Sequence, residues 1–384
     1  MKVAEKQANI KIIISGGGTG GHVFPAIAIA DALCRQLTNP DILFVGATGR
    51  MEMEKVPEAG YSIIGLPVEG FIRKFSLSNL KVILNLLRSL RMARRIIRQF
   101  SPQVVVGVGG YASAPVLRKA AGMGIPTLIQ EQNSYAGLTN RLLAKKAKKI
   151  CVAYKGMENY FPAERLILAG NPVRKEIIEI YTRDKTISSK GSATKASPEN
   201  PRTYFGFRED AKVLLILGGS LGARTINQSV LGKLDMIKES GISVLWQCGK
   251  YYHEEVKKSL EGEGESIVLK DFIQRMDMAY MAADVIIARA GAITISELCL
   301  VGKASILVPS PNVAEDHQTK NAKALSSQSA AIYIPDNEAV ERMIPEALDL
   351  LDDDKRQVIL SKNIAGMAIE DSADRIAREV IGIM

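Results

Sequence analysis

The sequence predicts an α/β protein built from two Rossmann-like domains, and three observations support this fold class. Short apolar runs rich in β-branched residues alternate with helical patterns along the chain. Two of these runs, Ile10–Ile14 and Val213–Leu217, lead directly into glycine-rich turns, so the second half of the chain repeats the opening of the first. The 384 residues, 47% of them hydrophobic and 24% charged, suffice for two or three domains of about 150 residues each.

The expected strands fall into two sets. Those of the first half are Ile10–Ile14, Ile42–Val45, Val104–Val108 and Thr127–Ile129, and those of the second half are Val213–Leu217, Ser243–Trp246, Val285–Ala288 and Ser305–Val308. Each set predicts an open parallel sheet, which binds ligands at the carboxyl ends of its strands. We therefore expect an active site in the cleft between the two domains. The stretch Thr182–Arg202 has almost no apolar residues and is interpreted as a solvated loop near the domain junction.

Three glycine-rich turns follow expected strands: Gly16–Gly21, Gly109–Ala114 and Gly218–Gly222. Glycine lets the backbone turn tightly and bring its N–H groups close to a phosphate at the start of the next helix. The alternative for each turn is close packing of a strand against a helix.

The first turn, Gly16-x-Gly18-x-x-Gly21, formally satisfies the dinucleotide-binding pattern. A nicotinamide site also needs a carboxylate at the end of the second strand to hold the ribose hydroxyls. Here that strand ends in Val45–Thr48, and Glu52 and Glu54 come later, so a nicotinamide cofactor is disfavoured. The sequence also lacks the G-x-x-x-x-G-K-[ST] pattern of an ATPase.

His22 follows the first glycine turn and precedes Val23-Phe24-Pro25, which places it near the start of a helix. A neutral imidazole there can accept a proton from a substrate hydroxyl, because imidazole titrates near neutrality and a helix N-terminus disfavours its cation. The alternative is a histidine that is satisfied locally or caps the helix. We interpret His22 as the candidate general base.

The net charge of +9 is compatible with an anionic partner such as phosphate, nucleic acid or a membrane, or with solubility alone. The four cysteines stand far apart without a C-x-x-C pair, which predicts neither a zinc site nor a disulfide framework and favours a reducing cytoplasm. No secretory signal is visible, and the most apolar stretch, Val104–Leu117, is too interrupted to cross a bilayer. We expect any membrane contact to be peripheral.

Positive charge is concentrated between Glu69 and Glu131, a window without acidic residues. Helical spacing predicts a basic face and an apolar face within it. The basic face comprises Lys81, Arg88, Arg91, Arg95 and Arg98, and the apolar face Ile83, Leu86, Leu87, Leu90, Ala93 and Ile97. This helix and the preceding Phe71–Leu80 segment are interpreted either as a core-packed helix with a solvated face or as a surface for an anionic cytoplasmic leaflet. Nucleic acid ranks last, because few aromatic residues are available for stacking.

Several segments carry a more specific signal when they are taken in order. They are Gly16–Pro25, Gly109–Tyr111, Glu131–Asn133, Ala136–Asn140, Gly170–Arg174, Gly218–Arg224 and Asp316–Ala322. Together they resemble the MurG family of bacterial glycosyltransferases, over a match that runs from about Ile10 to the C-terminal helices. The departures are Ala114, where many members have glycine, and the polar stretch Thr182–Arg202.

The resemblance implies transfer of N-acetylglucosamine from UDP-N-acetylglucosamine to the C4 hydroxyl of the muramyl sugar of lipid I. This inverting reaction gives lipid II for peptidoglycan synthesis and needs no cofactor or metal. The implied fold is GT-B, two Rossmann-like domains separated by a cleft, on an enzyme peripheral to the cytoplasmic face of the bacterial inner membrane. Residues 1–172 would form the acceptor and membrane-associating domain and residues 173–365 the UDP-sugar domain. A C-terminal helix within 366–384 would pack back on the first domain.

The resemblance also implies which residues bind the substrates. They are Thr19, Gly20, Gly21, Asn133, Arg174, Ser220, Ile273, Ala292, Ile293, Thr294, Ile295, Ser296, Glu297 and Gln318. Ser220 and its neighbouring amides would stabilise the leaving diphosphate in place of a metal ion. The backbone of Ile273 would pair with uracil, Glu297 would hold both ribose hydroxyls, and Gln318 would contact the sugar hydroxyls.

The residues themselves leave other interpretations of these positions open. Arg174 is also typical of a hinge salt bridge, and Ile273 of an ordinary core residue. Thr294 and Glu297 have the spacing of a capping box, in which the glutamate accepts a backbone N–H at a helix start. Gln318 is also typical of a surface helix.

Two other functions stay open. A different GT-B enzyme, such as a diacylglycerol glycosyltransferase or a UDP-sugar epimerase, would share the nucleotide chemistry, although Glu131–Asn140 and Asp316–Ala322 argue against it. A non-catalytic, nucleotide-responsive membrane protein would keep the glycine turns and the basic stretch, and would lose nothing on substitution of His22.

Overall fold

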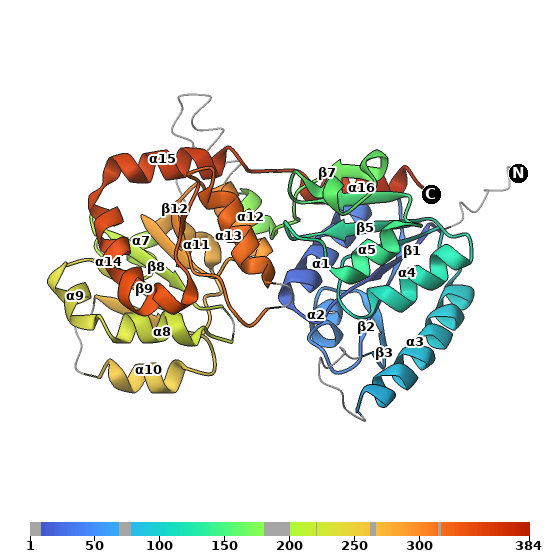
Figure 1. Ribbon diagram of the computed structural model, residues 1–384, viewed down its shortest axis with the longest axis horizontal. Helices are drawn as coiled ribbons and strands as arrows, with labels where there is room; N and C mark the ends of the chain where they lie inside the picture. The colour runs from blue at the N-terminus through green and yellow to red at the C-terminus, as the bar shows by residue number, and fades with distance from the viewer. Residues whose placement is uncertain (1–8, 69–77, 180–199, 220, 262–265, 314–315) are drawn as a thin grey trace, which may run out of the picture. The chain divides into compact units, whose positions relative to one another are not determined.

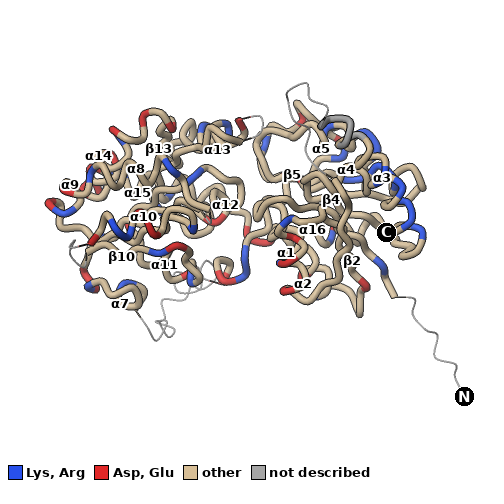
Figure 2. The backbone as a smooth tube through the Cα atoms, turned by 90° about the horizontal axis from the view of Figure 1, so that it is seen from below, with Lys and Arg blue, Asp and Glu red and all other residues tan. Residues whose placement is uncertain are grey.

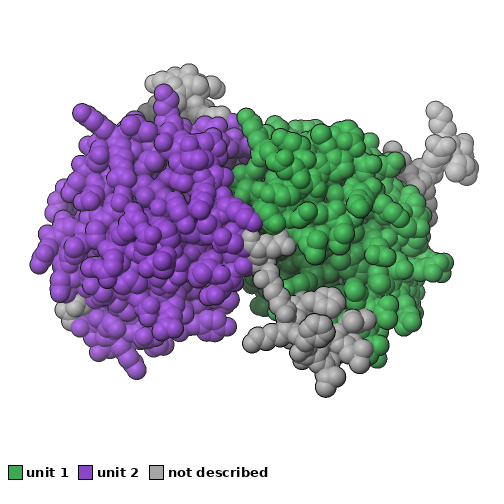
Figure 3. Space-filling model, viewed as in Figure 1, with its two compact units in different colours: residues 1–173, 371–384 green, residues 174–370 purple. Residues whose placement is uncertain are grey.

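The computed structural model describes residues 9–68, 78–179, 200–219, 221–261, 266–313 and 316–384, which form two compact units (Figures 1 and 3). Unit 1 comprises Met1–Val173 and Asp371–Met384, and unit 2 comprises Arg174–Glu370. The boundaries therefore follow Val173 and Glu370, whereas the sequence placed them after residues 172 and 365.

A parallel sheet forms the centre of unit 1, with seven strands among the described residues in the order β3-β2-β1-β4-β5-β6-β7. The strands are β1 (Lys11–Ser15), β2 (Asp41–Ala47), β3 (Ser62–Leu66), β4 (Val104–Gly107), β5 (Thr127–Glu131), β6 (Lys149–Val152) and β7 (Leu166–Leu168). The expected strands of the first half are confirmed as β1, β2, β4 and β5. The strands β3, β6 and β7 are additional to the prediction.

Helices cover both faces of this sheet (Figure 1). They are α1 (Gly20–Gln36), α2 (Glu52–Glu58), α3 (Ser78–Phe100), α4 (Ser113–Gly122), α5 (Leu138–Ala144) and α16 (Ser372–Ile381). Alternate strand residues face opposite sides, so Ile12 packs in a core with α1 and α16, while Ile13 packs in another with α3 and α4. Burial on both faces explains why these strands are apolar throughout instead of alternating with polar residues.

The C-terminal helix α16 belongs to unit 1, where it packs along α1. Ile376 and Val380 enter the same core as α1. At the edge of this contact, Arg35 Nη2 lies 2.9 Å from Asp374 Oδ1, and Gln36 Nε2 donates to the carbonyl oxygen of Asp374 over 3.1 Å. The last residues of the chain thereby complete the first unit.

Unit 2 has a second parallel sheet, with six strands among the described residues in the order β10-β9-β8-β11-β12-β13. The strands are β8 (Val213–Leu217), β9 (Ser243–Gln247), β10 (Ile267–Lys270), β11 (Val285–Ala288), β12 (Ala304–Leu307) and β13 (Ile332–Tyr333). The helices are α7 (Pro201–Tyr204), α8 (Arg224–Leu231), α9 (Leu234–Glu239), α10 (His253–Ser259), α11 (Met276–Ala282), α12 (Ala292–Val301), α13 (His317–Ser326), α14 (Ala339–Asp352) and α15 (Asp354–Ala365). The expected strands β8, β9, β11 and β12 are confirmed, and β10 and β13 are additional.

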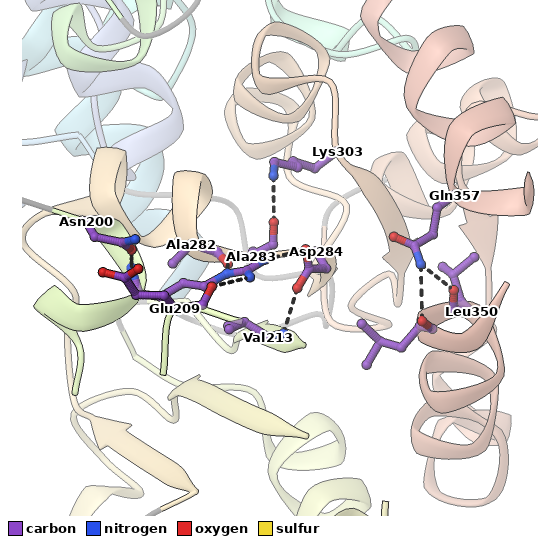
Figure 4. Close-up of polar contacts among 11 residues, drawn as sticks. Asn200, Glu209, Val213, Ala282, Ala283, Asp284, Lys303, Leu350 and Gln357 are labelled. Carbon is purple, nitrogen blue, oxygen red and sulfur yellow. Dashed lines mark hydrogen bonds and ion pairs between the residues drawn. The ribbon is translucent and has the colours of Figure 1, made fainter. Parts of the chain in front are cut away.

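The starts of β8 and β11 are held together by a polar cluster (Figure 4). Asp284 accepts the N–H of Val213 at 2.8 Å with one carboxylate oxygen, and its other oxygen lies 2.8 Å from Arg202 Nη2. Arg202 belongs to α7, whose first turn is capped by the side chain of Asn200. The expected loop 182–202 therefore ends as a helix, and its residues 182–199 lie outside the described part of the chain.

The order of the strands reverses beside the first strand of each unit, between β1 and β4 and between β8 and β11. Open parallel sheets bind their ligands outside the carboxyl ends of the strands at such a reversal. In unit 1 the turns after β1 and β4 begin with Gly16 and Val108, and in unit 2 the turns after β8 and β11 begin with Gly218 and Arg289. These turns are therefore where ligand-binding residues are expected.

Candidate active-site residues

The first glycine turn leads from β1 into α1. Gly17 and Gly18 have φ angles of 144° and 90°, which side chains rarely allow. Thr19 is the N-cap of α1, and its Oγ1 lies 3.1 Å from Nδ1 of His22 in the first turn of the helix. The expected position of His22 at a helix start is confirmed, and its ring has the local partner that the alternative interpretation required.

The glycine turn Gly109–Ala114 packs directly against the first. A Cβ on Gly109 would lie 2.8 Å from Nε2 of His22, and one on Gly110 would lie 2.2 Å from the carbonyl oxygen of Gly17. Ser113 strengthens this contact, because its Oγ is 2.7 Å from the carbonyl oxygen of Ser15 and 2.8 Å from that of Gly109. Glycine is required here by close packing, and this packing fixes the imidazole of His22 against the turn.

A carboxylate from α2 enters the first glycine turn, which the sequence analysis did not anticipate. Glu52 is 1% exposed. Its Oε2 accepts the N–H of Gly18 at 2.8 Å, and its Oε1 accepts the N–H of Ala47 at 2.9 Å. One amide of the expected phosphate cradle is thus engaged by the protein itself. No motif marks Glu52, since its role depends on where α2 is placed against β1 and β2.

The end of β5 carries a second buried carboxylate, Glu131. Oε1 accepts from the backbone N–H and the side-chain amide of Asn133, at 3.1 and 3.3 Å. Oε2 accepts from Asn140 Nδ2 at 2.8 Å and from the N–H of Gly137 at 3.3 Å. Burial raises the pKa of Glu131, and these hydrogen bonds oppose that rise. Glu131 therefore holds the segment that carries the predicted sugar-contacting Asn133.

A chain of buried amide side chains lies beside this carboxylate. Gln130 Nε2 donates to Asn171 Oδ1 at 2.9 Å, and Asn171 Nδ2 donates to the carbonyl oxygen of Gln132 at 3.0 Å. Gln132 Nε2 in turn donates to the carbonyl oxygen of Val108 at 2.6 Å. Because Val108 follows β4 and Gln132 follows β5, the network sets the spacing of the two strand ends.

The glycine turn Gly218–Gly222 lies between β8 and α8 in unit 2. Gly222 has a φ of 96°, and a Cβ there would lie 2.5 Å from the carbonyl oxygen of Cys248. Asn227 of α8 donates to that same carbonyl oxygen at 2.9 Å and accepts from Trp246 Nε1 at 3.1 Å. These contacts fix the start of α8 against β9. Ser220, the predicted diphosphate-binding residue, lies outside the described residues.

Glu297 of α12 lies at the centre of a buried polar group in unit 2. Its carboxylate is 3% exposed, with Oε1 2.8 Å from Nε of Arg174 and Oε2 2.9 Å from the hydroxyl of Tyr280. Burial raises the pKa of Glu297, and the attraction of Arg174 opposes it. Burial likewise raises the pKa of Tyr280 well above its usual value, so the phenol stays protonated and donates to the carboxylate.

The helix start next to Glu297 corrects one interpretation. Helix α12 begins at Ala292 after the N-cap Gly291, so Thr294 lies inside the helix and not at its N-cap. The capping-box interpretation is therefore wrong, because Glu297 bonds to Arg174 and Tyr280. Ile295 is 1% exposed and packs in the core, while Ala292, Ile293, Thr294 and Ser296 are partly exposed. Ser296 Oγ donates to the carbonyl oxygen of Ala292 at 3.0 Å.

Two further predicted residues use their polar groups within unit 2. The side chain of Ile273 is 2% exposed, and its backbone N–H donates to Gln247 Oε1 at 2.9 Å. Pairing of uracil with this N–H would require Gln247 to release it. Gln318, in the first turn of α13, accepts the N–H of Ser310 at 2.8 Å with its Oε1. For a sugar hydroxyl, the amide nitrogen can still donate and Oε1 has a second lone pair that can accept.

Helix α3 carries the predicted basic surface of unit 1 (Figure 2). Ala93, Ile96 and Ile97 are buried against α4 and the sheet, and Arg88, Arg91, Arg94, Arg95 and Arg98 are exposed. Leu87, placed on the apolar face by helical spacing, is instead 46% exposed beside Leu84 at 53%. Lys81, Ile83 and the segment 71–77 lie outside the described side chains.

The described residues include neither a cluster of metal-binding side chains nor a membrane-spanning helix. Within them, no three His, Cys, Asp or Glu side chains are grouped so that they could hold a metal ion. In the same part of the chain, no helix has the length and apolarity needed to cross a membrane.

Comparison with known proteins gives consistent relatives over the whole chain. The N-terminal domain of glycosyltransferase family 28 matches residues 12–152, and its C-terminal domain matches residues 213–376. A protein of Parabacteroides distasonis is 53% identical over 97% of this chain and 98% of its own length, and one of Porphyromonas gingivalis is 52% identical over 100% and 98%. Both are named UDP-N-acetylglucosamine–N-acetylmuramyl-(pentapeptide) pyrophosphoryl-undecaprenol N-acetylglucosamine transferase.

Solved structures agree with this grouping. The crystal structure of Acinetobacter baumannii MurG aligns with 97% of this chain and 99% of its own, with a TM-score of 0.75 at 27% identity. A UDP-GlcNAc 2-epimerase from Neisseria meningitidis, bound to UDP-GlcNAc, aligns with 97% of this chain and 100% of its own at a TM-score of 0.66. Its identity is 12%, so this likeness shows a shared GT-B fold alone.

Proposed function

The chain belongs to glycosyltransferase family 28, among the MurG enzymes, and on this premise we propose that it transfers N-acetylglucosamine from UDP-N-acetylglucosamine to lipid I. The product is lipid II for peptidoglycan synthesis. The observation that carries the proposal is where two groups of family-matching residues lie: Thr19 and His22 follow β1, and Glu297 follows β11, two of the strands at which the order of a sheet reverses. The acceptor binds mostly to unit 1, and the UDP-sugar binds mostly to unit 2.

His22 is the proposed base for the attacking C4 hydroxyl. Its Nδ1 lies 3.1 Å from Thr19 Oγ1. When Nδ1 carries the hydrogen and donates it to that hydroxyl, Nε2 has the lone pair that accepts the substrate proton. The attack forms the bond from the acceptor oxygen to C1 of the sugar while the bond from C1 to UDP breaks on the opposite side. Thr19, Gly20, Gly21 and Asn133 contact the donor sugar or its phosphates.

The nucleotide is proposed to bind unit 2. Both oxygens of Glu297 already accept one hydrogen bond, and each has a second lone pair for a ribose hydroxyl. Arg174 lies against this carboxylate and supplies positive charge near the diphosphate. The start of α12, with Ala292, Ile293, Thr294, Ile295 and Ser296, borders the same site, and a helix N-terminus favours an anion. Ser220 assists UDP departure, Ile273 contacts uracil, and Gln318 contacts the sugar.

The enzyme is proposed to work on the cytoplasmic face of the inner membrane, held there by α3. Exposed arginines on this helix attract anionic lipid headgroups, and the exposed Leu84 and Leu87 add apolar contact. The acceptor is itself tethered to a lipid, so this surface brings the active site to its substrate. Nucleic acid is not a proposed partner.

The test is UDP release with a short-chain lipid I analogue in EDTA, with UDP-N-acetylglucosamine, UDP-glucose and UDP-N-acetylgalactosamine as donors. We expect acceptor-dependent release that favours UDP-N-acetylglucosamine. His22→Ala should lower kcat by about 10²–10⁴-fold, the usual contribution of general-base catalysis. His253→Ala, a partly exposed histidine of α10, is the matched control and should retain the rate. Absence of acceptor-dependent release from a folded, UDP-binding protein would refute the proposal.

A further inference from the structure

The carboxylate of Glu52 occupies the place in the first glycine turn where a phosphate would be expected. It is held by two backbone N–H groups, from Gly18 after β1 and from Ala47 at the end of β2. Two backbone amides that converge on one buried carboxylate make an anion site. Here the anion is a side chain of the protein itself, from the next helix, α2.

Glycines around this carboxylate make room for it. A Cβ on Gly17 would lie 2.2 Å from Cδ of Glu52, and a Cβ on Gly46 would lie 2.5 Å from its Cγ. Glycine at these two positions is therefore explained by the glutamate side chain. A turn that served only a substrate phosphate would have no need of glycine at Gly46, which lies within β2.

Burial of this carboxylate carries a cost, which makes a purely structural role a poor explanation. Among the described residues, no ion pair to Glu52 is formed, and its charge is met by amides and by the N-terminus of its own helix. An apolar side chain at such a position avoids the desolvation of a charge. A glutamate here instead fixes Gly18 in a left-handed conformation, one residue before Thr19 and four before His22.

We propose that Glu52 is a positioning residue for the transfer reaction: it fills the anion site of the first glycine turn and thereby holds Thr19 and His22 in their working geometry. The N–H of Gly18 is then a structural donor and not a ligand of substrate phosphate. This inference rests on the proposed glycosyltransferase activity.

The first test compares Glu52→Gln with wild type and with Glu54→Gln, an exposed glutamate of the same helix. The glutamine has the shape of glutamate but can accept only one of the two N–H bonds. We expect kcat with UDP-N-acetylglucosamine and the lipid I analogue to fall at least tenfold, with the Kd for UDP unchanged within twofold. Glu54→Gln should match wild type. Wild-type turnover by Glu52→Gln would overturn the inference.

A double-mutant cycle asks whether Glu52 acts through His22. If it does, Glu52→Gln should cost less than twofold in kcat when His22 is already alanine, because the group it positions is gone. Equal fold losses in the two backgrounds would overturn the inference, since they would mean that Glu52 acts independently of His22.

Chemical rescue tests the carboxylate itself. The variant Glu52→Ala leaves the two amides facing a space the size of a small carboxylate. Added formate should restore its kcat at least fivefold, whereas sodium chloride at the same ionic strength should not. If Glu52→Ala has lost its thermal unfolding transition, Glu52→Gln and the cycle decide. A folded Glu52→Ala that does not respond to formate counts against the inference. If the wild-type enzyme is itself inactive, the proposed glycosyltransferase function is wrong. If the wild type is active and only the tests of Glu52 fail, the inference about Glu52 alone is wrong.

Discussion

At the scale of single residues, the buried acid Glu297 of unit 2 has two partners of different kinds. Glu297 bonds to the cation of Arg174 and to the neutral hydroxyl of Tyr280. The arginine is partly exposed, with 40% of its side chain accessible, and the tyrosine is 1% exposed. Packing in the core therefore fixes the position of Tyr280. Its hydroxyl in turn orients the carboxylate of Glu297 toward Arg174 and toward a bound ligand.

Tyr280→Phe should weaken nucleotide binding without unfolding unit 2. The change removes one hydrogen bond to a charged group, worth about 1.5–3 kcal/mol, and leaves the ring packing intact. We expect the Kd for UDP to rise roughly tenfold, since about 1.4 kcal/mol corresponds to that factor. Titration calorimetry with UDP and 2′-deoxy-UDP should also show a smaller preference for the ribose form in the variant.

Tyr204→Phe is the matched control, because Tyr204 is 39% exposed and lies at the end of α7. It should bind both nucleotides as wild type does. The role given to Glu297 is wrong if wild type does not distinguish UDP from 2′-deoxy-UDP. The role given to Tyr280 alone is wrong if wild type distinguishes them and Tyr280→Phe does so equally well.

Glu131 makes stability depend on pH in a definite direction. Burial raises its pKa in the folded protein above the usual 4.5, so the folded state holds this proton to higher pH than the unfolded state. The stabilisation is fully present below pH 4.5 and is lost as pH rises through the raised pKa. The amide in Glu131→Gln has no proton to lose in this pH range, so the variant lacks this contribution. Urea unfolding from pH 4 to 8 should show wild type losing stability relative to the variant, and a constant difference would contradict this.

At the scale of elements, α3 packs one face into the core of unit 1 and exposes a basic face. One face packs Ala93, Ile96 and Ile97 into the core of unit 1, while the arginines and Leu84 face outward. The helix is long enough, with 23 residues, to do both. This exposed surface fits both a solvated basic face and the proposed contact with anionic lipid.

Reversal of charge on α3 should release the protein from anionic membranes. Each basic residue near such a surface contributes about 1 kcal/mol, so Arg91→Glu, Arg94→Glu and Arg95→Glu together should lower vesicle binding by well over tenfold. Cosedimentation with vesicles containing phosphatidylglycerol measures this. The loss should shrink at high salt, because the attraction is screened.

The matched control reverses the charge of three exposed lysines of unit 2 by substitution with glutamate: Lys250, Lys257 and Lys258. It changes the net charge by the same amount and should leave vesicle binding nearly intact. Equal losses in both triple variants would mean that net charge, and not the α3 surface, governs the binding. Turnover of a short-chain acceptor in solution should be unaffected by either.

At the scale of the whole molecule, the four cysteines differ in burial and hence in expected reactivity. Cys34 is exposed on α1, whereas Cys151, Cys248 and Cys299 are buried in the two units. Burial raises the pKa of Cys151 and Cys299 to about 12 and that of Cys248 to about 11. Thiolates react and thiols do not, so the buried three should be inert in the folded protein.

Ellman's reagent at pH 8 should therefore modify one thiol of the native protein quickly and all four after denaturation. Cys34→Ser should abolish the fast phase and leave the other three unchanged. Rapid reaction of a second thiol in the native protein would show that one of the units opens in solution.

The sequence alone determined the parts of this protein that depend on local pattern. Apolar runs followed by glycine predicted β1, β4, β8 and β11, because a buried parallel strand is recognisable by composition and a turn by its glycines. Edge strands such as β3 and β13 were not predicted, because their residues are only partly buried and because they form strands only by pairing with a neighbouring strand. The position of His22 was likewise readable, because a helix start is a local event.

Only the tertiary structure decided which side chains meet. Glu52 enters the first glycine turn from the next helix, and Tyr280 reaches Glu297 from α11, contacts for which no spacing along the chain gives a rule. The capping box at Thr294 failed for the same reason: the local spacing was correct, yet Glu297 bonds to the guanidinium of Arg174 and the buried hydroxyl of Tyr280 and not to a backbone N–H. Local pattern places the elements, and long-range burial chooses the partners of a charge.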